Sequence, residues 1–473
     1  MQLSTSRIYV SLTLLFIVTL CYSQNQLTLK KGIVTDSLNV PSTNNSFSIY
    51  LPRNFDPNKN WPIVLGFDSS GKESGLTRLY MAAAEELGYI VAISNFNNDQ
   101  TPKEKANYVP VFMTHIFSLF PIQIGRVYVT GMGKDAEIAS LLPLLIPDKI
   151  FGVVAIANSH YYKSNMRMKK NFSYIAMTNN GNHRYKDLLA NKNLLKRKAI
   201  AADVFVHDGD LDFPDQLLIR KALSTFTAQA MLKGRMPKDS IWIQKRFQED
   251  IESVDNYLEK EKYVIAHDEL KRIRIHYNSF FDTDHLKEKQ KEIRKLNGYK
   301  REKRLQSKFE NKEIYLREGY LFSADEDIEL LNYENLGWWQ YEVTKLDSLL
   351  ISKQKPAQNM AKRVKGYLKH LVDSYKEIEL NNQDDFEKKM FLNVFSTIVD
   401  KKDFESYKRI ISFSARDQDY ETALFYLEKM LQNGYKDFES LYTIEGTLAL
   451  KLSKDYNRLI KKYLGNSKYF FSK

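Results

Sequence analysis

Short apolar runs alternate with helix-like segments in the first half of this chain and are absent from the second half, and this change constrains the fold most. Seven runs of four or five residues, rich in Val, Ile, Phe and Tyr, are predicted strands: 47–51, 63–67, 90–94, 127–130, 153–157, 174–177 and 204–207. Strands that alternate with helices usually form a mostly parallel sheet covered by helices on both faces. We therefore expect an α/β domain over residues 24–232.

A predicted helix over residues 215–232 closes this domain. It follows Pro214 and begins with Asp215, as helix starts often do. Its apolar positions lie on one stripe that we expect to pack on the sheet: Leu218, Ala222, Leu223, Phe226 and Ala230. The strand pattern then disappears, so residues 233–473 are predicted to form an all-helical domain.

Two segments of the helical part resemble degenerate tetratricopeptide units, which are pairs of helices joined by a short turn. The segment ISFSARDQDYETALFYLEKMLQNGY has one helix ending near Arg416 and a second with Ala423 and Leu424 at the small and large packing positions. An earlier segment repeats the spacing of Tyr, Ala and Leu through Tyr263, Ala266 and Leu270. A helical-repeat domain is the prediction, and a plain helical bundle is the alternative.

A strongly charged helix is predicted between these segments, over residues 285–316. Its apolar positions form a narrow stripe that suits a helical hairpin or a solenoid element: Leu286, Ile293, Leu296, Leu305, Phe309 and Leu316. The whole chain has a formal net charge of +12, but its lysines and arginines alternate with glutamates. A solvated surface explains this pattern better than a nucleic-acid site does, and attraction to acidic partners stays open.

The first 23 residues have the pattern of an export signal. Arg7 precedes an apolar run over residues 8–20, and small residues at Cys21 and Ser23 suit cleavage after Ser23. Thirteen apolar residues are few for a membrane span, which needs about 20, so an uncleaved anchor is the alternative. Cys21 is the single cysteine, and the mature protein is therefore expected to contain neither disulfides nor a thiol nucleophile.

Three stretches carry a resemblance to a known fold: WPIVLGFDSSGKESGLTRLYMAAAEELGYIVAISN, GRVYVTGMGKDAEIA and VHDGDLDFPDQLLIRKAL. They resemble the α/β-hydrolase fold, and specifically secreted bacterial esterase-like proteins with a C-terminal helical extension. The resemblance covers roughly residues 40–280. It implies a Ser, an Asp or Glu and a His in that chain order, each on a loop at the carboxyl end of a strand. The serine attacks, the histidine takes its proton and the carboxylate orients the histidine.

All three positions are substituted when the chain is placed on this pattern. Gly133 stands at the nucleophile position, Gly181 at the acid position and Leu211 at the histidine position. A second alignment makes Asp212 the acid and seeks the histidine in LKGRMPKD, which contains none. Both alignments predict a catalytically degenerate site whose backbone persists.

The loop after the second predicted strand also argues against catalysis. Asp68 lies where hydrolases often place an oxyanion donor, and its charge would repel a developing oxyanion. Ser69 or Ser70 as a displaced nucleophile is the weaker reading, because the sequence indicates no base nearby.

Metal and cofactor sites are not expected. The run Asp208, Asp210, Asp212 fails the calcium-loop pattern, because Phe213 stands at position six and Ile219 at position twelve. The eight histidines have no metal-ligand spacing, and GMGKD lacks the spacing of a phosphate-binding loop.

The sequence thus predicts an exported protein with a degenerate α/β-hydrolase-like domain and a helical domain. We expect it to bind a protein partner or a cell-envelope ligand, through the helical surface or the vacant hydrolase cleft, and not to bind nucleic acid. The alternatives are an esterase or acyl hydrolase with a displaced nucleophile, or a purely structural role.

Overall fold

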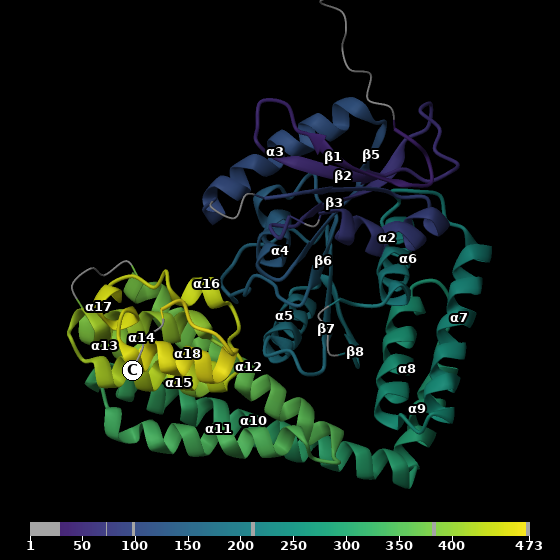
Figure 1. Cartoon of the computed structure of the whole chain (residues 1–473). Helices are drawn as coiled ribbons and strands as arrows, with labels where there is room; N and C mark the ends of the chain where they lie inside the picture. The colour runs from purple at the N-terminus through teal and green to yellow at the C-terminus, as the bar shows by residue number, and fades with distance from the viewer. Residues whose placement is uncertain (1–28, 72, 97–99, 210–212, 381–384, 470–473) are drawn as a thin grey trace, which may run out of the picture. The chain divides into compact units, whose positions relative to one another are not determined.

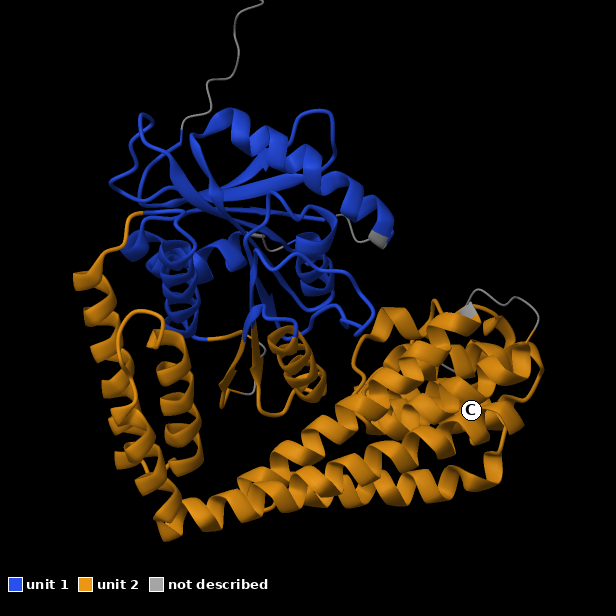
Figure 2. Cartoon of the chain, turned by 180° about the vertical axis from the view of Figure 1, so that it is seen from behind, with its two compact units in different colours: residues 1–175, 198–202, 215–236 blue, residues 176–197, 203–214, 237–473 orange. Residues whose placement is uncertain are grey.

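The computed structural model describes residues 29–71, 73–96, 100–209, 213–380 and 385–469, so the predicted signal peptide lies outside the described residues. The chain divides into two compact units (Figure 2). Unit 1 comprises Met1–Ile175, Lys198–Ala202 and Asp215–Met236, and unit 2 comprises Ala176–Arg197, Asp203–Pro214 and Pro237–Lys473. Each unit is treated by itself below.

The sheet has eight strands in the order β1-β2-β4-β3-β5-β6-β7-β8. Their bounds are β1 Val34–Asn39, β2 Ser46–Tyr50, β3 Trp61–Phe67, β4 Ile90–Ser94, β5 Ile122–Met132, β6 Gly152–Ile156, β7 Ser173–Asn179 and β8 Ala201–His207. The pairs β1–β2 and β2–β4 are antiparallel, whereas β3–β4, β3–β5 and β5–β6 are parallel. This order, with helices between the parallel strands, is that of the α/β-hydrolase fold, and it confirms the predicted fold class.

The seven predicted strands all correspond to observed ones, but the sequence missed β1. The sequence of β1, VTDSLN, contains no run of apolar residues, and none of its residues is buried. Six of the seven predicted runs are fully buried, for example those of β3 and β4, whereas the run in β8 is mostly half-buried. A hydrophobic run therefore marks the centre of a sheet and fails to mark a polar edge strand.

Four helices pack on the sheet in unit 1: α2 Glu73–Leu87, α3 Pro102–Leu119, α4 Lys134–Leu145 and α6 Gln216–Leu232. Helices α2 and α6 contact each other, and Figure 1 shows them on one face of the sheet with α3 on the other. The Asp215 side chain caps α6, as predicted, by accepting a hydrogen bond from the Leu218 N–H. The predicted stripe of α6 packs inward, where the Phe226 ring stacks on Tyr128 with ring centroids 4.6 Å apart.

Unit 2 is mostly helical. It contains α5 Tyr185–Arg197, α7 Ser240–Glu259, α8 Tyr263–Tyr277, α9 His285–Lys295, α10 Asn297–Leu330, α11 Leu336–Leu350, α12 Lys355–Leu380, α13 Phe386–Val399, α14 Phe404–Arg416, α15 Tyr420–Gln432, α16 Phe438–Leu441, α17 Leu448–Lys451 and α18 Lys454–Leu464. One apolar cluster surrounds the fully buried Trp339 on α11, and another includes Tyr407, Ala423 and Leu427 on α14 and α15. The predicted all-helical region is confirmed as helical.

Helix–turn–helix pairs occur where the sequence predicted repeat units. Helices α7 and α8 pack together, as do α14 and α15, and Ala266, Leu270 and Ala423 are fully buried in these pairs. Five helices, α9 to α13, separate the two pairs along the chain. The assignment of either pair to the tetratricopeptide family stays a prediction.

The charged segment from His285 onward was predicted as one continuous helix, but it forms two helices. Leu296 adopts an extended conformation with ψ 136°, which ends α9 and lets α10 begin at Asn297. The side chains of Leu286, Ile293 and Phe309 are buried, as the stripe predicted, but Leu296 is exposed. The stripe therefore belongs to two helices, which are separated at Leu296.

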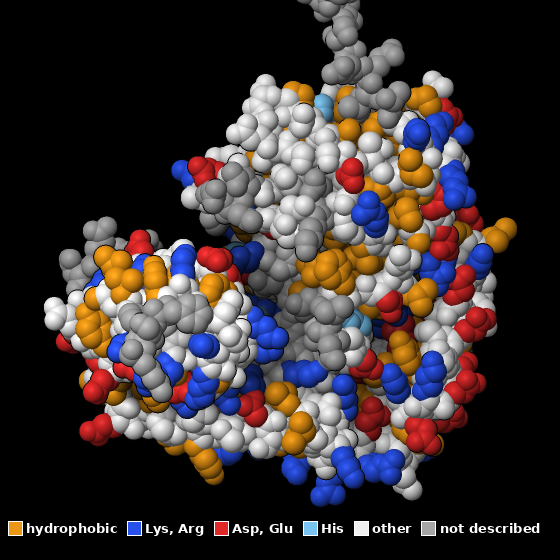
Figure 3. Space-filling view, viewed as in Figure 1, with side chains coloured by type: hydrophobic (Ala, Val, Ile, Leu, Met, Phe, Trp, Pro, Cys, Tyr) orange, Lys and Arg blue, Asp and Glu red, His pale blue; other side chains and the backbone are white. Residues whose placement is uncertain are grey.

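The surface carries charges of both signs. On the face seen in Figure 3, lysines and arginines are interspersed with aspartates and glutamates. Among the described residues, none of the helices combines the length and apolar content that a membrane span requires.

Candidate functional site

A sharp turn joins β5 to α4 in unit 1, where the sequence predicts the degenerate nucleophile position. Gly133 precedes α4 with φ 57° and ψ −126°, a conformation that residues with a side chain rarely adopt. Its N–H donates to the Ile156 carbonyl oxygen at 3.0 Å, which ties the turn to the end of β6. A Cβ atom on Gly131 would lie 2.5 Å from the Asp135 carbonyl oxygen, so the first turn of α4 requires glycine there. The strand–turn–helix elbow is thus formed without a hydroxyl group at its tip.

The space beside the Gly133 α-carbon is open. A Cβ atom built there would meet no heavy atom of the described residues within 4 Å, apart from its chain neighbours. A small side chain therefore fits sterically, and only the positive φ opposes it. The correspondence of Gly133 with a hydrolase nucleophile stays a prediction.

A closed polar cluster lies beside this turn, and we call Ser69, Lys105 and Asp135 the Asp135 cluster. The Ser69 hydroxyl donates to Asp135 Oδ1 at 2.6 Å, and the Ser69 N–H donates to Asp135 Oδ2 at 2.6 Å. Lys105 Nζ donates to Ser69 Oγ at 2.6 Å and lies 3.5 Å from Asp135 Oδ1. The side chains of Lys105 and Asp135 are only 11% and 6% exposed, so solvent screens this ion pair weakly.

The Asp135 cluster occupies groups that an acyl hydrolase keeps free. An oxyanion hole needs backbone N–H groups aimed at the place where negative charge develops. In the loop after β3, the Asp68 N–H donates to the Ser94 carbonyl oxygen at 3.0 Å, and the Ser69 N–H donates to the Asp135 carboxylate. The Ser94 carbonyl oxygen thus occupies the Asp68 N–H, and the Asp135 carboxylate occupies the Ser69 N–H.

Asp68 was predicted to place a negative charge at the oxyanion position, but in the structure its carboxylate has a different partner. Its carboxylate accepts a hydrogen bond from the Ser70 N–H at 2.9 Å, which is a local turn within the loop. Asp135, and not Asp68, therefore carries the negative charge at the Ser69 N–H. Ser70 itself is exposed and belongs to no buried cluster.

Sequence reasoning named Ser69 but missed Lys105 and Asp135. Asp135 stands where the G-x-S-x-G pattern has its last glycine, so a carboxylate at that position was a readable signal. Lys105 has no comparable signal, because it is one of several charged residues at the start of α3. The sequence indicated no basic group near Ser69, and the structure places the Lys105 amine there.

The predicted acid position, Gly181, lies in unit 2 in the loop between β7 and α5. The Gly181 N–H donates to Asn179 Oδ1 at 2.8 Å, and a Cβ atom on Gly181 would lie 2.9 Å from Lys362 Cδ. The loop lines a polar cavity of about 240 Å³ together with Asp208 and Asn359. A side chain at position 181 would require the Lys362 side chain to shift.

Asp208 is the carboxylate that this cavity does contain. It accepts hydrogen bonds from Asn180 Nδ2 at 2.9 Å and from Lys262 Nζ at 2.8 Å. Partial burial alone would raise its pKa, but the hydrogen bond and the charge of Lys262 outweigh burial and lower it. Asp208 is therefore a charged, paired group at neutral pH.

Two arginines from the helices hold the same loop by its backbone. Arg363 of α12 donates to the Asn180 carbonyl oxygen at 2.6 Å, and Arg317 of α10 donates to the His183 carbonyl oxygen at 2.7 Å. Both arginines pair with Glu313, whose side chain is fully buried. This explains physically why residues 176–197 group with the helices of unit 2.

The histidines are less scattered than the sequence indicated. His183 and His370 are far apart in the chain, but their ring centroids lie 5.3 Å apart. Burial, together with the charges of Arg184, His370 and Arg317, lowers the pKa of His183 to about 4. His183 is therefore neutral at physiological pH.

Several predicted positions lie outside the described residues. Leu211, the predicted histidine position, Asp212, the alternative acid, and Asp210 of the aspartate run are among them. Over the part of the chain that the structure describes, no three His, Cys, Asp or Glu side chains come together as metal ligands would.

Comparisons with known proteins give likeness of structure only. No protein-family model matches the chain, and no curated protein matches it. A feruloyl esterase module from Clostridium thermocellum aligns at 14% identity over 40% of this chain and 85% of its own, with a TM-score of 0.33. A fluorophosphonate-binding serine hydrolase from Staphylococcus aureus aligns at 13% identity over 41% of this chain and 97% of its own, also with a TM-score of 0.33.

An esterase from Pyrobaculum calidifontis aligns at 13% identity over 49% of this chain and 94% of its own, with a TM-score of 0.35. The α/β-hydrolase-like fold follows from the strand order and the elbow, independently of these likenesses.

Proposed function

We propose that this chain is an exported, non-catalytic α/β-hydrolase-like protein that binds a protein partner or a cell-envelope ligand. One observation best supports the absence of catalysis: the Asp135 carboxylate accepts hydrogen bonds from both the N–H and the hydroxyl group of Ser69. An oxyanion would have to displace this buried carboxylate from a site where Lys105 already neutralises it. The substitutions at Gly133, Gly181 and Leu211 point in the same direction.

The alternative function, an acyl hydrolase with Ser69 as the displaced nucleophile, is favoured by one contact. Lys105 Nζ lies 2.6 Å from Ser69 Oγ, which is within reach for a general base. A base must accept a proton, however, whereas an ammonium that is ion-paired with Asp135 donates one. The same contact is therefore explained more simply as a structural hydrogen bond.

A fluorophosphonate probe separates the two functions. Residues 24–473 are incubated with the probe, and the intact mass is read together with those of Ser69→Ala and Ser70→Ala variants and an active serine hydrolase as a positive control. We expect no adduct on the folded protein, as judged by circular dichroism. A stoichiometric adduct that disappears in Ser69→Ala would establish the alternative function and overturn the proposal.

Export rests on the N-terminal sequence and has its own test. The apolar run over residues 8–20 and the small residues before Gln24 support cleavage after Ser23. Expression of the full chain with its signal in a bacterial host should give a secreted or periplasmic protein whose first residue is Gln24. A protein that stays in the cytoplasmic fraction and retains Met1 would contradict export.

Removal of residues 233–473 is a poor test of which part binds. Residues 176–197 and 203–214 belong to the same unit as the helices, and Arg317 and Arg363 hold them there. The truncated chain would lose these contacts and expose buried surface. Point variants on the helical unit are therefore the better experiment.

A further inference from the structure

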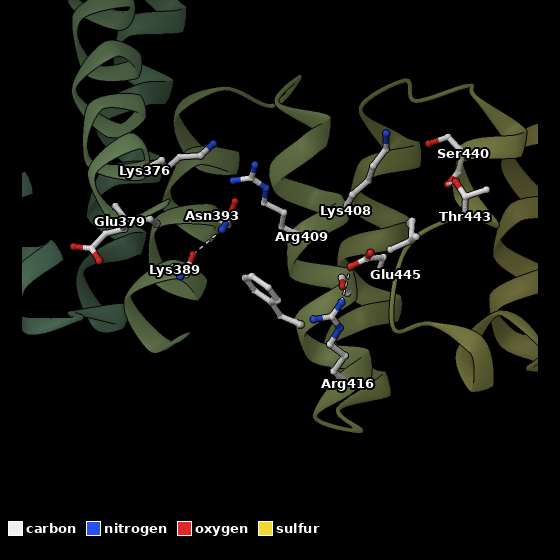
Figure 4. Close-up of a pocket in the computed structure, with 14 residues that line it drawn as sticks. Lys376, Glu379, Lys389, Asn393, Lys408, Arg409, Arg416, Ser440, Thr443 and Glu445 are labelled. Carbon is white, nitrogen blue, oxygen red and sulfur yellow. Dashed lines mark hydrogen bonds and ion pairs between the residues drawn. The ribbon is translucent and has the colours of Figure 1, made fainter. Parts of the chain in front are cut away.

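A groove of about 510 Å³ lies on the helical unit, lined by residues of α12, α13, α14, α16 and the segment after α16 (Figure 4). We call it the α12–α16 groove. Its volume is within the range of about 300–1,000 Å³ that is typical of ligand sites. Side chains from four helices converge on it, so a bound molecule would contact elements that are far apart in the sequence.

The carboxylates that line the groove are already neutralised. Glu379 Oε1 lies 3.4 Å from Lys388 Nζ, and Glu445 Oε2 lies 2.7 Å from the Arg416 guanidinium group. Neither carboxylate is therefore available as a free anion to a cationic ligand.

The cations that line the groove are neutralised only in part. Lys376 pairs with Asp403 at 2.8 Å, and Lys408 pairs with Glu405 at 2.8 Å. Lys389 and Arg409, by contrast, have no ion pair with any residue that the structure describes. With five cationic and two anionic side chains, the lining has a net charge of +3 (5 − 2).

Two of these cations are directed at each other. Figure 4 shows the side chains of Lys376 and Arg409 pointing toward one another across the groove. Lys376 Nζ already donates to Asp403, Ser396 and Ser406, so Arg409 is the one of the two cations that has no ion pair among the described residues. The unpaired Arg409 guanidinium is exposed and has the planar donor geometry that binds carboxylates through two hydrogen bonds.

The floor of the groove is apolar. Leu392 and Ile444 are buried, and the half-buried Phe413 ring packs on Phe386 with centroids 5.1 Å apart. A ligand that fits this lining combines negative charge with an apolar side chain.

We propose that the α12–α16 groove binds an extended acidic segment of a partner protein, with carboxylates on Arg409 and Lys389 and an apolar side chain beside Phe413. This names the partner class for the binding function proposed above and rests on that function. A nucleic acid fits less well, because its affinity depends on how many phosphates the Lys and Arg side chains neutralise. Two cations of the groove lack an ion pair with a described residue, and Glu379 and Glu445 would lie near the phosphates.

Fluorescence anisotropy with residues 24–473 tests the proposal. The probe is a fluorescein-labelled octapeptide in which Glu alternates with Leu, compared with an octapeptide of Lys and Leu and with a labelled single-stranded oligonucleotide. We expect saturable binding of the acidic peptide that weakens as salt is added. The Lys389→Glu/Arg409→Glu variant should bind it about tenfold or more weakly.

A matched control carries the same change of net charge outside the groove. Lys436 and Lys454 are exposed and do not line it, so Lys436→Glu/Lys454→Glu should bind the acidic peptide as the unchanged protein does. Equal weakening in both variants, no saturable binding by the unchanged protein, or an oligonucleotide bound as tightly as the peptide would each overturn the proposal. The fluorophosphonate result is independent of this outcome, so failure of the groove leaves the non-catalytic function standing.

Discussion

The Asp135 cluster and the α12–α16 groove both gather charged side chains, but they differ in how those charges are satisfied. In the Asp135 cluster, one buried carboxylate accepts hydrogen bonds from the Ser69 N–H and the Ser69 hydroxyl and forms an ion pair with the Lys105 ammonium. Each of these groups therefore has a partner within the protein. In the groove, Lys389 and Arg409 have no ion pair among the described residues. The first arrangement stabilises the protein and excludes an external anion, whereas the second is open to one.

The largest expected effect is on the closed arrangement. Asp135→Ala should lower the free energy of unfolding of unit 1 by about 3–5 kcal/mol, because it leaves the buried Lys105 without its counter-ion. The matching change in the groove, Arg409→Ala, should stay within about 0.5 kcal/mol of the unchanged protein, since Arg409 is exposed and unpaired. Urea denaturation followed by circular dichroism measures both.

A double variant shows whether the loss arises from the unpaired charge. Lys105→Met/Asp135→Leu removes both charges and should recover only part of the stability lost in Asp135→Ala, because the Ser69 N–H and hydroxyl still lack their acceptor. A double variant as unstable as the single one would mean that the hydrogen bonds from Ser69 to Asp135, and not the ion pair, determine the stability.

A smaller effect on stability is expected at Asp403, whose hydrogen bonds hold Lys376 beside the groove. Asp403 accepts hydrogen bonds from Lys376, Ser396 and Ser406. Burial alone would raise its pKa, but these hydrogen bonds and the charge of Lys376 outweigh burial and hold the pKa well below the ordinary value. Because the unfolded chain binds the proton more tightly, the stabilisation is complete above about pH 4–5 and is lost as pH falls through the folded-state pKa.

Asp403→Asn should therefore be less stable at pH 7 and should lose stability less steeply than the unchanged protein between pH 5 and pH 2. The exposed Asp417 gives a matched control, because Asp417→Asn should keep the unchanged stability at neutral pH. Denaturation midpoints across this pH range test the slope. Parallel curves for Asp403→Asn and the unchanged protein would contradict the assignment of Asp403.

The smallest expected effect is at the tip of the elbow. Gly133→Ser should cost about 1–2 kcal/mol, because a side chain must adopt positive φ in an otherwise open space. We expect it to form no fluorophosphonate adduct, since the Ser69 N–H remains on the Asp135 carboxylate. Gly133→Ala is the control for the backbone cost, and rapid labelling of Gly133→Ser alone would show that the elbow retains its chemistry.

Sequence patterns predicted what depends on local order along the chain. The buried strands, the cap of α6 by Asp215 and the glycine at the elbow tip each follow from a few adjacent residues. The edge strand β1 was missed because its polar residues carry no periodic signal. The break at Leu296 was missed because the charged stripe continues on both sides of it.

The charged sites depend on contacts that local patterns do not contain. Lys105 reaches Ser69 from a different helix, and Arg363 reaches the Asn180 carbonyl oxygen from α12. Lys389 and Arg409 lie on α13 and α14, and only the packing of these helices places them in one groove. Asp135 is different, because the stretch GMGKD itself shows an aspartate where the hydrolase motif has its last glycine.

The open space beside Gly133 also makes the elbow a convenient position for a chemical label. Cys21 is the single cysteine of the sequence and lies in the segment 1–23, so a Gly133→Cys variant of residues 24–473 would have one thiol. A nitroxide or an environment-sensitive dye attached there would sit at the end of β5, where, apart from the chain neighbours, no described atom lies within 4 Å of the Cβ position. Its signal would report ligand entry at the elbow directly, in a protein that needs no other cysteine removed.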